Sequence, residues 1–158
     1  MVIQIDTREK PHAIEKILET FDEQNIKHIS SKMYVGDYQD LSNGTLVIDR
    51  KQNLQELMNN VCRDHIRFRN ELIRAQEAGI KIIVLIEHGD GIKTLEDVKN
   101  WKNPYTKKYG KEAMTKISGD RLYKTLCTMN KKYGVVFEFC DKNETGKRII
   151  EILSKKAI

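Results

Sequence analysis

A short run of residues, Leu46-Val47-Ile48-Asp49-Arg50-Lys51, joins an apolar segment to an acid and two bases. The apolar part contains two β-branched residues and predicts a buried strand. Side chains alternate along a strand, so Asp49 and Lys51 share one face and Arg50 points to the other. A carboxylate can bind a divalent cation, and an ammonium beside it can hold a phosphate or polarise a water. The run therefore predicts either a small reactive centre or a strand that ends in a solvated loop.

Further acids stand at or beside the ends of other predicted strands. They are Asp6, Asp37 and Glu87. Open α/β sheets bind ligands along the ends of their strands. Acids gathered at such an edge repel one another, so a bound cation or raised pKa values must accompany them. Because no His or Cys joins these acids, we expect a hard cation with oxygen ligands, Mg²⁺ or Mn²⁺.

The turn before the strand decides whether Asp37 and Asp49 can act together. Ser42-Asn43-Gly44 is a hairpin signal. A two-residue turn would place the two acids on opposite faces of the sheet, whereas a three-residue turn or an equivalent bulge pairs Asp37 with Asp49. Side chains that lie directly opposite are about 4.5–5.5 Å apart at Cβ. We therefore predict the three-residue turn or an equivalent bulge, because only these bring both acids to one side.

The composition indicates a globular chain with one core. A length of 158 residues suits one domain, and 32% charged with 39% hydrophobic residues argues against a disordered chain. No apolar run is long enough to span a bilayer, and no signal peptide is recognisable. Three Cys without a C-x-x-C pair fit a reducing cytoplasm and argue against secretion. The net charge of +5 mildly favours a polyanionic partner.

Strand and helix patterns alternate along the chain. Strand patterns cover residues 2–5, 26–35, 38–41, 46–51, 81–87 and 135–140, and helical patterns cover 11–25, 53–61, an Arg-rich segment that ends at Gly79, 94–101, 120–132 and 145–156. This order predicts an α/β sandwich around a mixed sheet, in one domain over residues 1–158. Residues 89–117 are polar and basic, and we expect them to form an excursion from the core or a solvated surface loop.

Three motifs follow one another along the chain. They are Asp6-Thr7-Arg8-Glu9, Gly36-Asp37-Tyr38 and Val47-Ile48-Asp49-Arg50-Lys51. In this order they resemble the nuclease domain of the XPF/Hef structure-specific endonucleases, which belong to the restriction-endonuclease-like group. The resemblance extends through the Arg-rich helix, the strand that ends at Glu87, and the last strand and helix. It implies a restriction-endonuclease-like α/β fold, a three-layer sandwich with a mixed central β-sheet flanked by helices.

Two positions depart from the pattern of that family. Asp49 stands where the family has Glu, and Gln55 stands where it has a trailing Asp, with Glu56 next to it. An Asp can still ligate a metal, but the role of the trailing acid is not transferred to Gln55. The helix-hairpin-helix domain that usually follows is not expected, because the chain ends at Ile158. This suggests a compact stand-alone enzyme, a cytoplasmic bacterial protein or a viral protein in its host cell.

The resemblance implies a role for each matching acid and for the lysine. Asp37 and Asp49 would be metal ligands, and Lys51 would be the catalytic lysine. Asp6 and Glu9 would be supporting acids in the catalytic set, with Asp6 also a candidate metal ligand.

The resemblance also implies roles for the arginines. Arg50 would hold phosphate or brace the acids through bidentate hydrogen bonds, and Arg8 is a candidate for the same task. Arg67 and Arg69 would track the DNA backbone, with a solvated helix face as the alternative.

With the resemblance, these residues imply a Mg²⁺- or Mn²⁺-dependent endonuclease that hydrolyses phosphodiester bonds, and the resemblance implies branched or flapped DNA as the substrate, as found in repair, recombination and replication intermediates. One alternative is a non-catalytic DNA-binding or scaffold module of the same fold. Another is a Holliday-junction-resolvase-like or sequence-specific enzyme. Family members usually work as dimers, so a homodimer is considered, with the apolar side of the last helix as its surface and core burial as the alternative. That side carries Ile149, Ile150, Ile152, Leu153 and Ile158.

Overall fold

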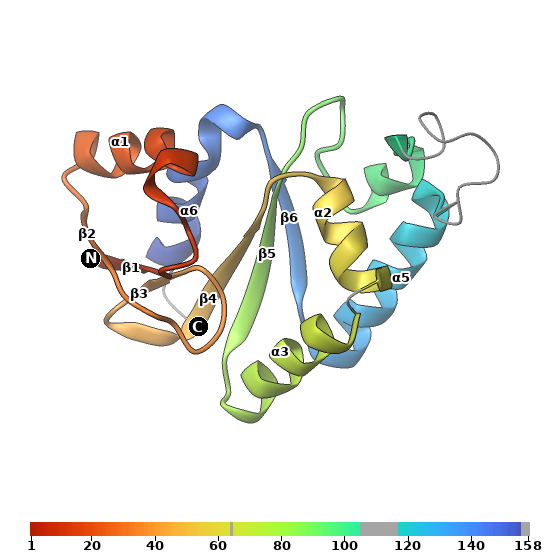
Figure 1. Cartoon of the computed structure of the whole chain (residues 1–158), viewed down its shortest axis with the longest axis horizontal. Coiled ribbons are helices and arrows are strands. Elements are labelled where there is room, and N and C mark those ends of the chain that lie inside the picture. Colours follow the sequence, from red (N-terminus) through yellow and green to blue (C-terminus); the bar gives the residue numbers. More distant parts are fainter. Residues whose placement is uncertain (64, 105–116, 156–158) are drawn as a thin grey trace.

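The computed structural model describes residues 1–63, 65–104 and 117–155 (Figure 1). Six strands form one sheet in the order β2-β1-β3-β4-β5-β6. β3 runs antiparallel to β1 and β4, and the remaining neighbours are parallel. The predicted mixed sheet is therefore confirmed. Its strands are β1 (Val2–Ile5), β2 (Lys27–Ser30), β3 (Tyr38–Asp40), β4 (Asn43–Lys51), β5 (Lys81–Glu87) and β6 (Val136–Cys140).

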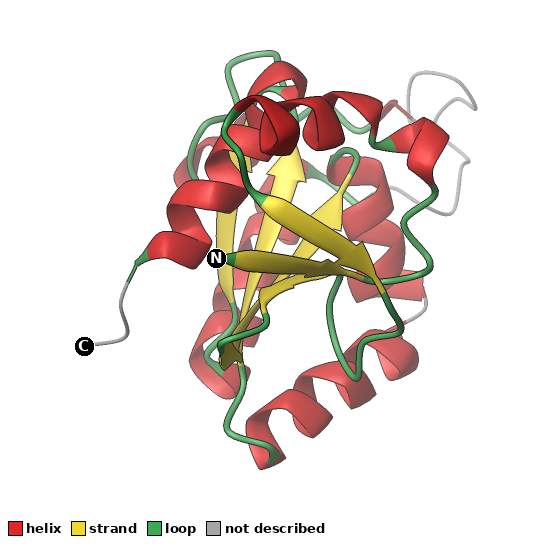
Figure 2. Cartoon of the chain, turned by 90° about the vertical axis from the view of Figure 1, so that its left-hand side faces the viewer, coloured by secondary structure: helices red, strands yellow, loops and turns green. Residues whose placement is uncertain are grey.

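Helices cover both faces of this sheet, as Figures 1 and 2 show. One face carries α1 (Glu15–Glu23) and α6 (Thr145–Ser154), and the other carries α2 (Leu54–Met58), α3 (His65–Glu77) and α5 (Gly119–Tyr133). The predicted three-layer sandwich is confirmed. Shorter helical segments lie beside these helices or elsewhere along the chain: η1 (Pro11–Ala13), the π-helical η2 (Asn59–Arg63), η3 (Glu96–Asn100) and η4 (Lys142–Glu144).

The two faces of β4 enter two different cores. Val47 belongs to the core under α2, α3 and α5, and Ile48 belongs to the core under α1 and α6. This follows from the alternation of side chains along a strand. β5 is apolar at nearly every position because both of its faces are covered, with Val84 in the first core and Leu85 in the second.

The helix ends follow the expected signals. Asn53 caps α2, because its side chain accepts a hydrogen bond from the backbone N–H of Glu56 at 2.8 Å. Positive φ angles occur at Gly134, directly after α5, and at Asn25 and Gly79, each two residues after the last residue of α1 and α3. These positions therefore end their helices as the sequence predicts.

One predicted strand is too long. The pattern predicts a strand over residues 26–35, but β2 ends at Ser30. The Gln4 side chain donates to the carbonyls of Ser31 and Lys32, and the Asp6 carboxylate accepts from the N–H of Met33 at 2.8 Å. These side-chain bonds replace ladder bonds to a neighbouring strand, so residues 31–37 form a loop.

The segment 89–117 was expected to leave the core, but the described residues near both of its ends are buried in the core. Ile92, Val98, Trp101 and Ile117 are all buried in the core under α2, α3 and α5. η3 lies within the short helix predicted over residues 94–101. The basic residues Lys107, Lys108, Lys111 and Lys116 lie outside the described residues.

The apolar side of α6 packs inward. Ile149, Ile152 and Leu153 are buried in the second core, and Ile150 is packed against it. Of the two interpretations considered for this side, the described residues support core burial; Ile158 lies outside them. No helix in the described part of the chain is long and apolar enough to cross a membrane.

Candidate active site

A bulge in the β3–β4 hairpin brings Asp37 opposite Asp49. Asp40 pairs with Asn43 across a tight turn, whereas Tyr38 pairs with Ile48, and the register shifts between these two pairs. The backbone N–H of Asp37 donates to the carbonyl of Ile48 at 2.8 Å. The equivalent bulge therefore forms in place of the three-residue turn, and it produces the predicted register.

Gly36 allows the chain to turn just before Asp37. Its φ angle is +73°, which glycine adopts without the steric cost that other residues meet. A Cβ at this position would lie 3.0 Å from Val47 Cγ2 and 3.1 Å from the carbonyl oxygen of Ile48. The N–H of Gly36 donates to Oε1 of Glu71 on α3 at 3.0 Å. The loop is thus pressed against β4 and tied to α3, which fixes the position of Asp37.

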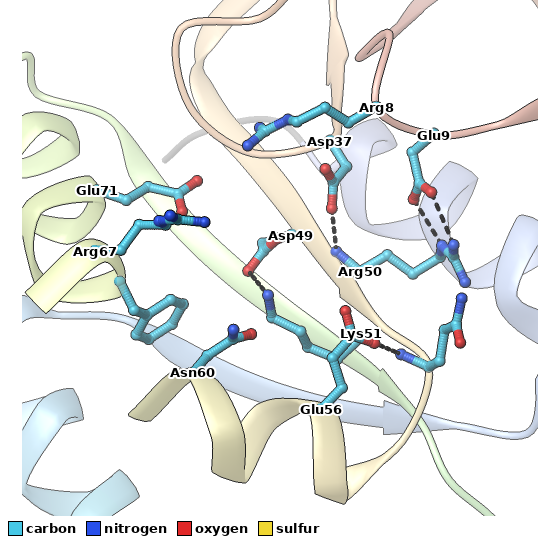
Figure 3. Close-up of a pocket in the computed structure, with 12 residues that line it drawn as sticks. Arg8, Glu9, Asp37, Asp49, Arg50, Lys51, Glu56, Asn60, Arg67 and Glu71 are labelled. Carbon is cyan, nitrogen blue, oxygen red and sulfur yellow. Dashed lines mark hydrogen bonds and ion pairs between the residues drawn. The ribbon is translucent and has the colours of Figure 1, made fainter. Parts of the chain in front are cut away.

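A polar pocket opens between the end of β4, α2 and α3 (Figure 3). Lys51 and Asp49 point into it from one face of β4, and their Nζ and Oδ2 atoms lie 3.0 Å apart. The Phe68 ring lies beneath the ammonium, with its centroid 5.5 Å away. The pocket is lined by Arg8, Glu9, Asp37, Asp49, Arg50, Lys51, Gln52, Glu56, Asn60, Arg67, Phe68 and Glu71.

Arg50 points to the opposite face of β4 and joins two acids. Its Nε and Nη2 donate to the two carboxylate oxygens of Glu9 at 2.6 and 2.8 Å, and its Nη1 donates to Glu87. The three side chains are 9% exposed or less. Of the two roles considered for Arg50, the geometry is that of a brace, because the bidentate contact is made to an acid within the protein.

Asp6 holds the loop that precedes Asp37. Its carboxylate is buried and accepts hydrogen bonds from the N–H and Nε of Arg8 and from the N–H of Met33. Burial alone would raise the pKa of Asp6, but these hydrogen bonds outweigh it and lower the pKa. Both oxygens are used in this way, so Asp6 lies behind the pocket, while the exposed side chain of Arg8 reaches its rim.

Two acids in the pocket were not identified from the sequence. Glu71 reaches it from α3, and Glu56 reaches it from α2 while accepting a hydrogen bond from the N–H of Gln52. A signal for Glu71 exists, because it lies three and four residues from the buried Phe68 and Ala75, on the same side of the helix. A charged residue beside a buried helix face indicates a buried polar site.

Two acids of the pocket, Asp37 and Glu71, have raised pKa values. Burial, and then the charge of Asp49, raise the pKa of Asp37 well above its usual value. The same two causes, in the same order, raise the pKa of Glu71. For Lys51, burial alone would lower the pKa, but the charge and hydrogen bond of Asp49, together with the charges of Asp37 and Glu56, outweigh it and raise the pKa. Asp49 is therefore the charge that couples these three groups.

The structure brings most of the predicted site residues together. Glu9, Asp37, Asp49, Arg50, Lys51, Arg8 and Arg67 line one pocket, whereas Asp6 and Arg69 do not. The four strand-end acids therefore do not form one cluster, because Asp6 is bonded to Arg8 and Met33, and Glu87 to Arg50.

The sandwich, with its bulged hairpin and the acid and lysine at the end of β4, defines a restriction-endonuclease-like fold. Residues 5–152 match the ERCC4 domain, and the chain belongs to the ERCC4 domain family. The resemblance to the XPF/Hef group is thereby confirmed. No curated protein matches the chain in sequence.

Solved structures share this fold. XPF from Aeropyrum pernix has 15% sequence identity and a TM-score of 0.64, over 97% of this chain and 63% of that chain. The same protein in complex with DNA has 17% identity and a TM-score of 0.62, over 96% of this chain and 62% of that chain. The chain thus spans less than two thirds of the length of either structure.

Proposed function

We propose that the pocket hydrolyses phosphodiester bonds in DNA and that the protein is an endonuclease acting on branched or flapped DNA. The observation that carries this proposal is the arrangement of Asp37 and Asp49 on neighbouring strands, with Lys51 beside Asp49 in an open pocket. Membership of the ERCC4 domain family supports it. So does the fold shared with an XPF that binds DNA.

The acids fit a hard divalent cation. Oδ2 of Asp49 is buried and receives no well-aligned hydrogen bond, although the Lys51 ammonium lies 3.0 Å away. Mg²⁺ is commonly held by one or two carboxylates together with waters and substrate phosphate oxygens. Asp37 and Asp49 supply such a pair, even though no three His, Cys, Asp or Glu side chains in the described ranges have the spacing of a complete metal site. Asp6 is better assigned as a support, because its oxygens are already hydrogen-bonded.

Each remaining group has a task that follows from its position. A bound Mg²⁺ or Mn²⁺ would supply charge stabilisation at the phosphate and lower the pKa of a water. Lys51 would orient that water or hold a non-bridging phosphate oxygen, because its ammonium faces the pocket beside Asp49. Arg8 and Arg67, at the rim, would bind flanking phosphates. Arg50 would hold the segment that follows β1 against the end of β4 through its bonds to Glu9.

Cleavage of labelled flap, four-way-junction and plain duplex DNA with Mg²⁺ or Mn²⁺ tests the proposal. We expect cleavage of the branched substrates that EDTA abolishes, and loss of cleavage with largely retained binding in Asp49→Asn and Lys51→Met. Asp120→Asn and Lys124→Met are matched controls, because Lys124 and Asp120 form the same kind of pair, 3.1 Å apart, on the exposed side of α5. Undiminished cleavage in EDTA or in Asp49→Asn would refute the mechanism.

A non-catalytic DNA-binding module of the same fold is the second candidate. The position of Gln55 favours it, because this residue lines a hollow with Trp101 and Lys102 and the position of the family's trailing acid holds no carboxylate, although Glu56 next to it reaches the pocket. In the same assay, that candidate predicts binding of branched DNA with no cleavage under any metal condition.

A further inference from the structure

One side of α3 carries exposed polar residues beside the pocket. Arg67, Asn70 and Arg74 are spaced by three and four residues, so they lie in a row along the helix. Arg67 belongs to the pocket lining. Arg69 is also exposed, but two residues along a helix turn it to the opposite side from Arg67. Arg67 and Arg69, the two arginines expected to contact the DNA backbone, therefore point in different directions. Of these two, only Arg67 lines the pocket.

An exposed aromatic ring stands at one end of this row. Tyr34 is 66% exposed, and the guanidinium carbon of Arg74 lies 5.8 Å from its ring centroid. The loop that carries Tyr34 is fixed on both sides, by Met33 N–H bonded to Asp6 and by Gly36 N–H bonded to Glu71. The backbone on both sides of Tyr34 is therefore fixed, three residues before Asp37, and the exposed ring has Arg74 beside it.

The other end of the row opens into a second hollow. Ile66, Arg67 and Asn70 help to line it, and Ile66 is 65% exposed. Arg67 lines both this hollow and the pocket, so the two lie next to each other. A path of cationic, amide and apolar groups thus passes the pocket from Tyr34 to Ile66.

We propose that this path, Tyr34 with Arg74, Asn70 and Arg67, binds a single-stranded arm of the DNA substrate. Arg74 and Arg67 would contact phosphates, and an unpaired base would stack on Tyr34. The inference rests on the proposed function for the identity of the partner as DNA.

The chemistry of the path selects an unpaired strand. The faces of bases in a duplex are covered by their neighbours, whereas those of a single strand are free to stack on an aromatic ring. Arg67 and Arg74 are seven residues apart, roughly 10 Å along the helix axis at 1.5 Å per residue. This is a distance that a few nucleotides cover. Stacking beside cations is the combination with which proteins bind single strands without reading their sequence.

Fluorescence anisotropy of a labelled oligo(dT) in EDTA tests the path without requiring cleavage. We expect Tyr34→Ala to weaken binding ~5- to 150-fold and Tyr34→Phe to leave it within about threefold of wild type, since stacking needs only the ring. Arg74→Met should weaken binding and lower the salt slope by roughly 0.7, the value for one phosphate contact on a single strand. Arg69→Met is the matched control, with the same charge change on the other side of α3, and should leave the salt slope unchanged.

The outcomes separate this inference from the proposed function. Equal binding by Tyr34→Ala and wild type would overturn the path, as would equal losses in Arg69→Met and Arg74→Met. A blunt duplex that binds as tightly as oligo(dT), with the same sensitivity to Tyr34→Ala, would also overturn it. Tyr34-dependent binding by a protein that cleaves nothing would support the path and refute the endonuclease. Thermal unfolding checks that each variant folds, which the exposure of Tyr34 leads us to expect.

Discussion

Removing the Arg50 side chain tests how the site is held together. Arg50→Met keeps the length of the side chain but leaves Glu9 and Glu87 as buried carboxylates without their cation. Loss of one partner from a buried ion pair costs about 3–5 kcal/mol, because the remaining charge has lost its water and gained no partner. For a chain of this length, each kcal/mol lowers the melting temperature by ~2–4 °C, so we expect a fall of ~6–20 °C.

Arg148→Met is the matched control, measured by the same urea and thermal unfolding. Arg148 also bridges two acids, Glu138 at 2.9 Å and Glu151 at 2.8 Å, but these side chains are 24–52% exposed. Such pairs contribute about 0–1 kcal/mol, so its variant should remain close to wild type. The triple variant Arg50→Met, Glu9→Gln, Glu87→Gln should recover part of the loss, because buried amides cost less than buried charges. Equal losses in Arg50→Met and Arg148→Met would refute the brace.

Two further outcomes follow from the Asp37 loop. Gly36→Ala and Gly134→Ala both place Ala at a φ near +72°, but only the first adds a Cβ within 4 Å of other atoms. Urea unfolding should therefore show a loss of ~1–3 kcal/mol in the free energy of unfolding for Gly36→Ala and a smaller loss for Gly134→Ala. Asp37→Asn should stabilise the metal-free protein above the raised pKa of Asp37, where the native carboxylate is charged against Asp49. Asp37 has a higher pKa in the folded protein than in the unfolded chain, so the folded protein takes up this proton first as the pH falls. The stability gained by Asp37→Asn should therefore shrink as the pH falls through the raised pKa. A stability difference that is constant from pH 4 to pH 8 would contradict this account.

Local signals account for the parts of the fold that sequence predicts well. The alternation along β4, the Asn53 cap and the left-handed ends at Gly79 and Gly134 each depend on a few neighbouring residues. The pairing of Asp37 with Asp49 was also predictable, because only one register brings the two acids together. The position of the bulge was not, since a bulge between Tyr38 and Asp40 and a three-residue turn give the same register at the site.

The contacts that sequence could not supply join residues far apart in the chain. Glu87 meets Arg50 from a strand 37 residues away, and Glu71 meets Gly36 across 35 residues. The end of β2 was misplaced for the same reason, because the side chains of Gln4 and Asp6 replace its ladder bonds. Each of these contacts depends on which strands are neighbours, and that order is a property of the whole sheet.

The strand that carries the candidate site residues Asp49 and Lys51 also contacts both helix layers. Asp49 and Lys51 face the layer of α2 and α3, where burial and then the charge of Asp49 raise the pKa of both Asp37 and Glu71. Arg50, between them in sequence, faces the other layer and bonds to Glu9, in the segment after β1, and to Glu87, the last residue of β5. The acids of the pocket repel one another on one face of β4, while buried ion pairs on the opposite face of β4 hold the strand in place. A cation between Asp37 and Asp49 would relieve that repulsion without moving the strand, which is the condition for a preorganised site.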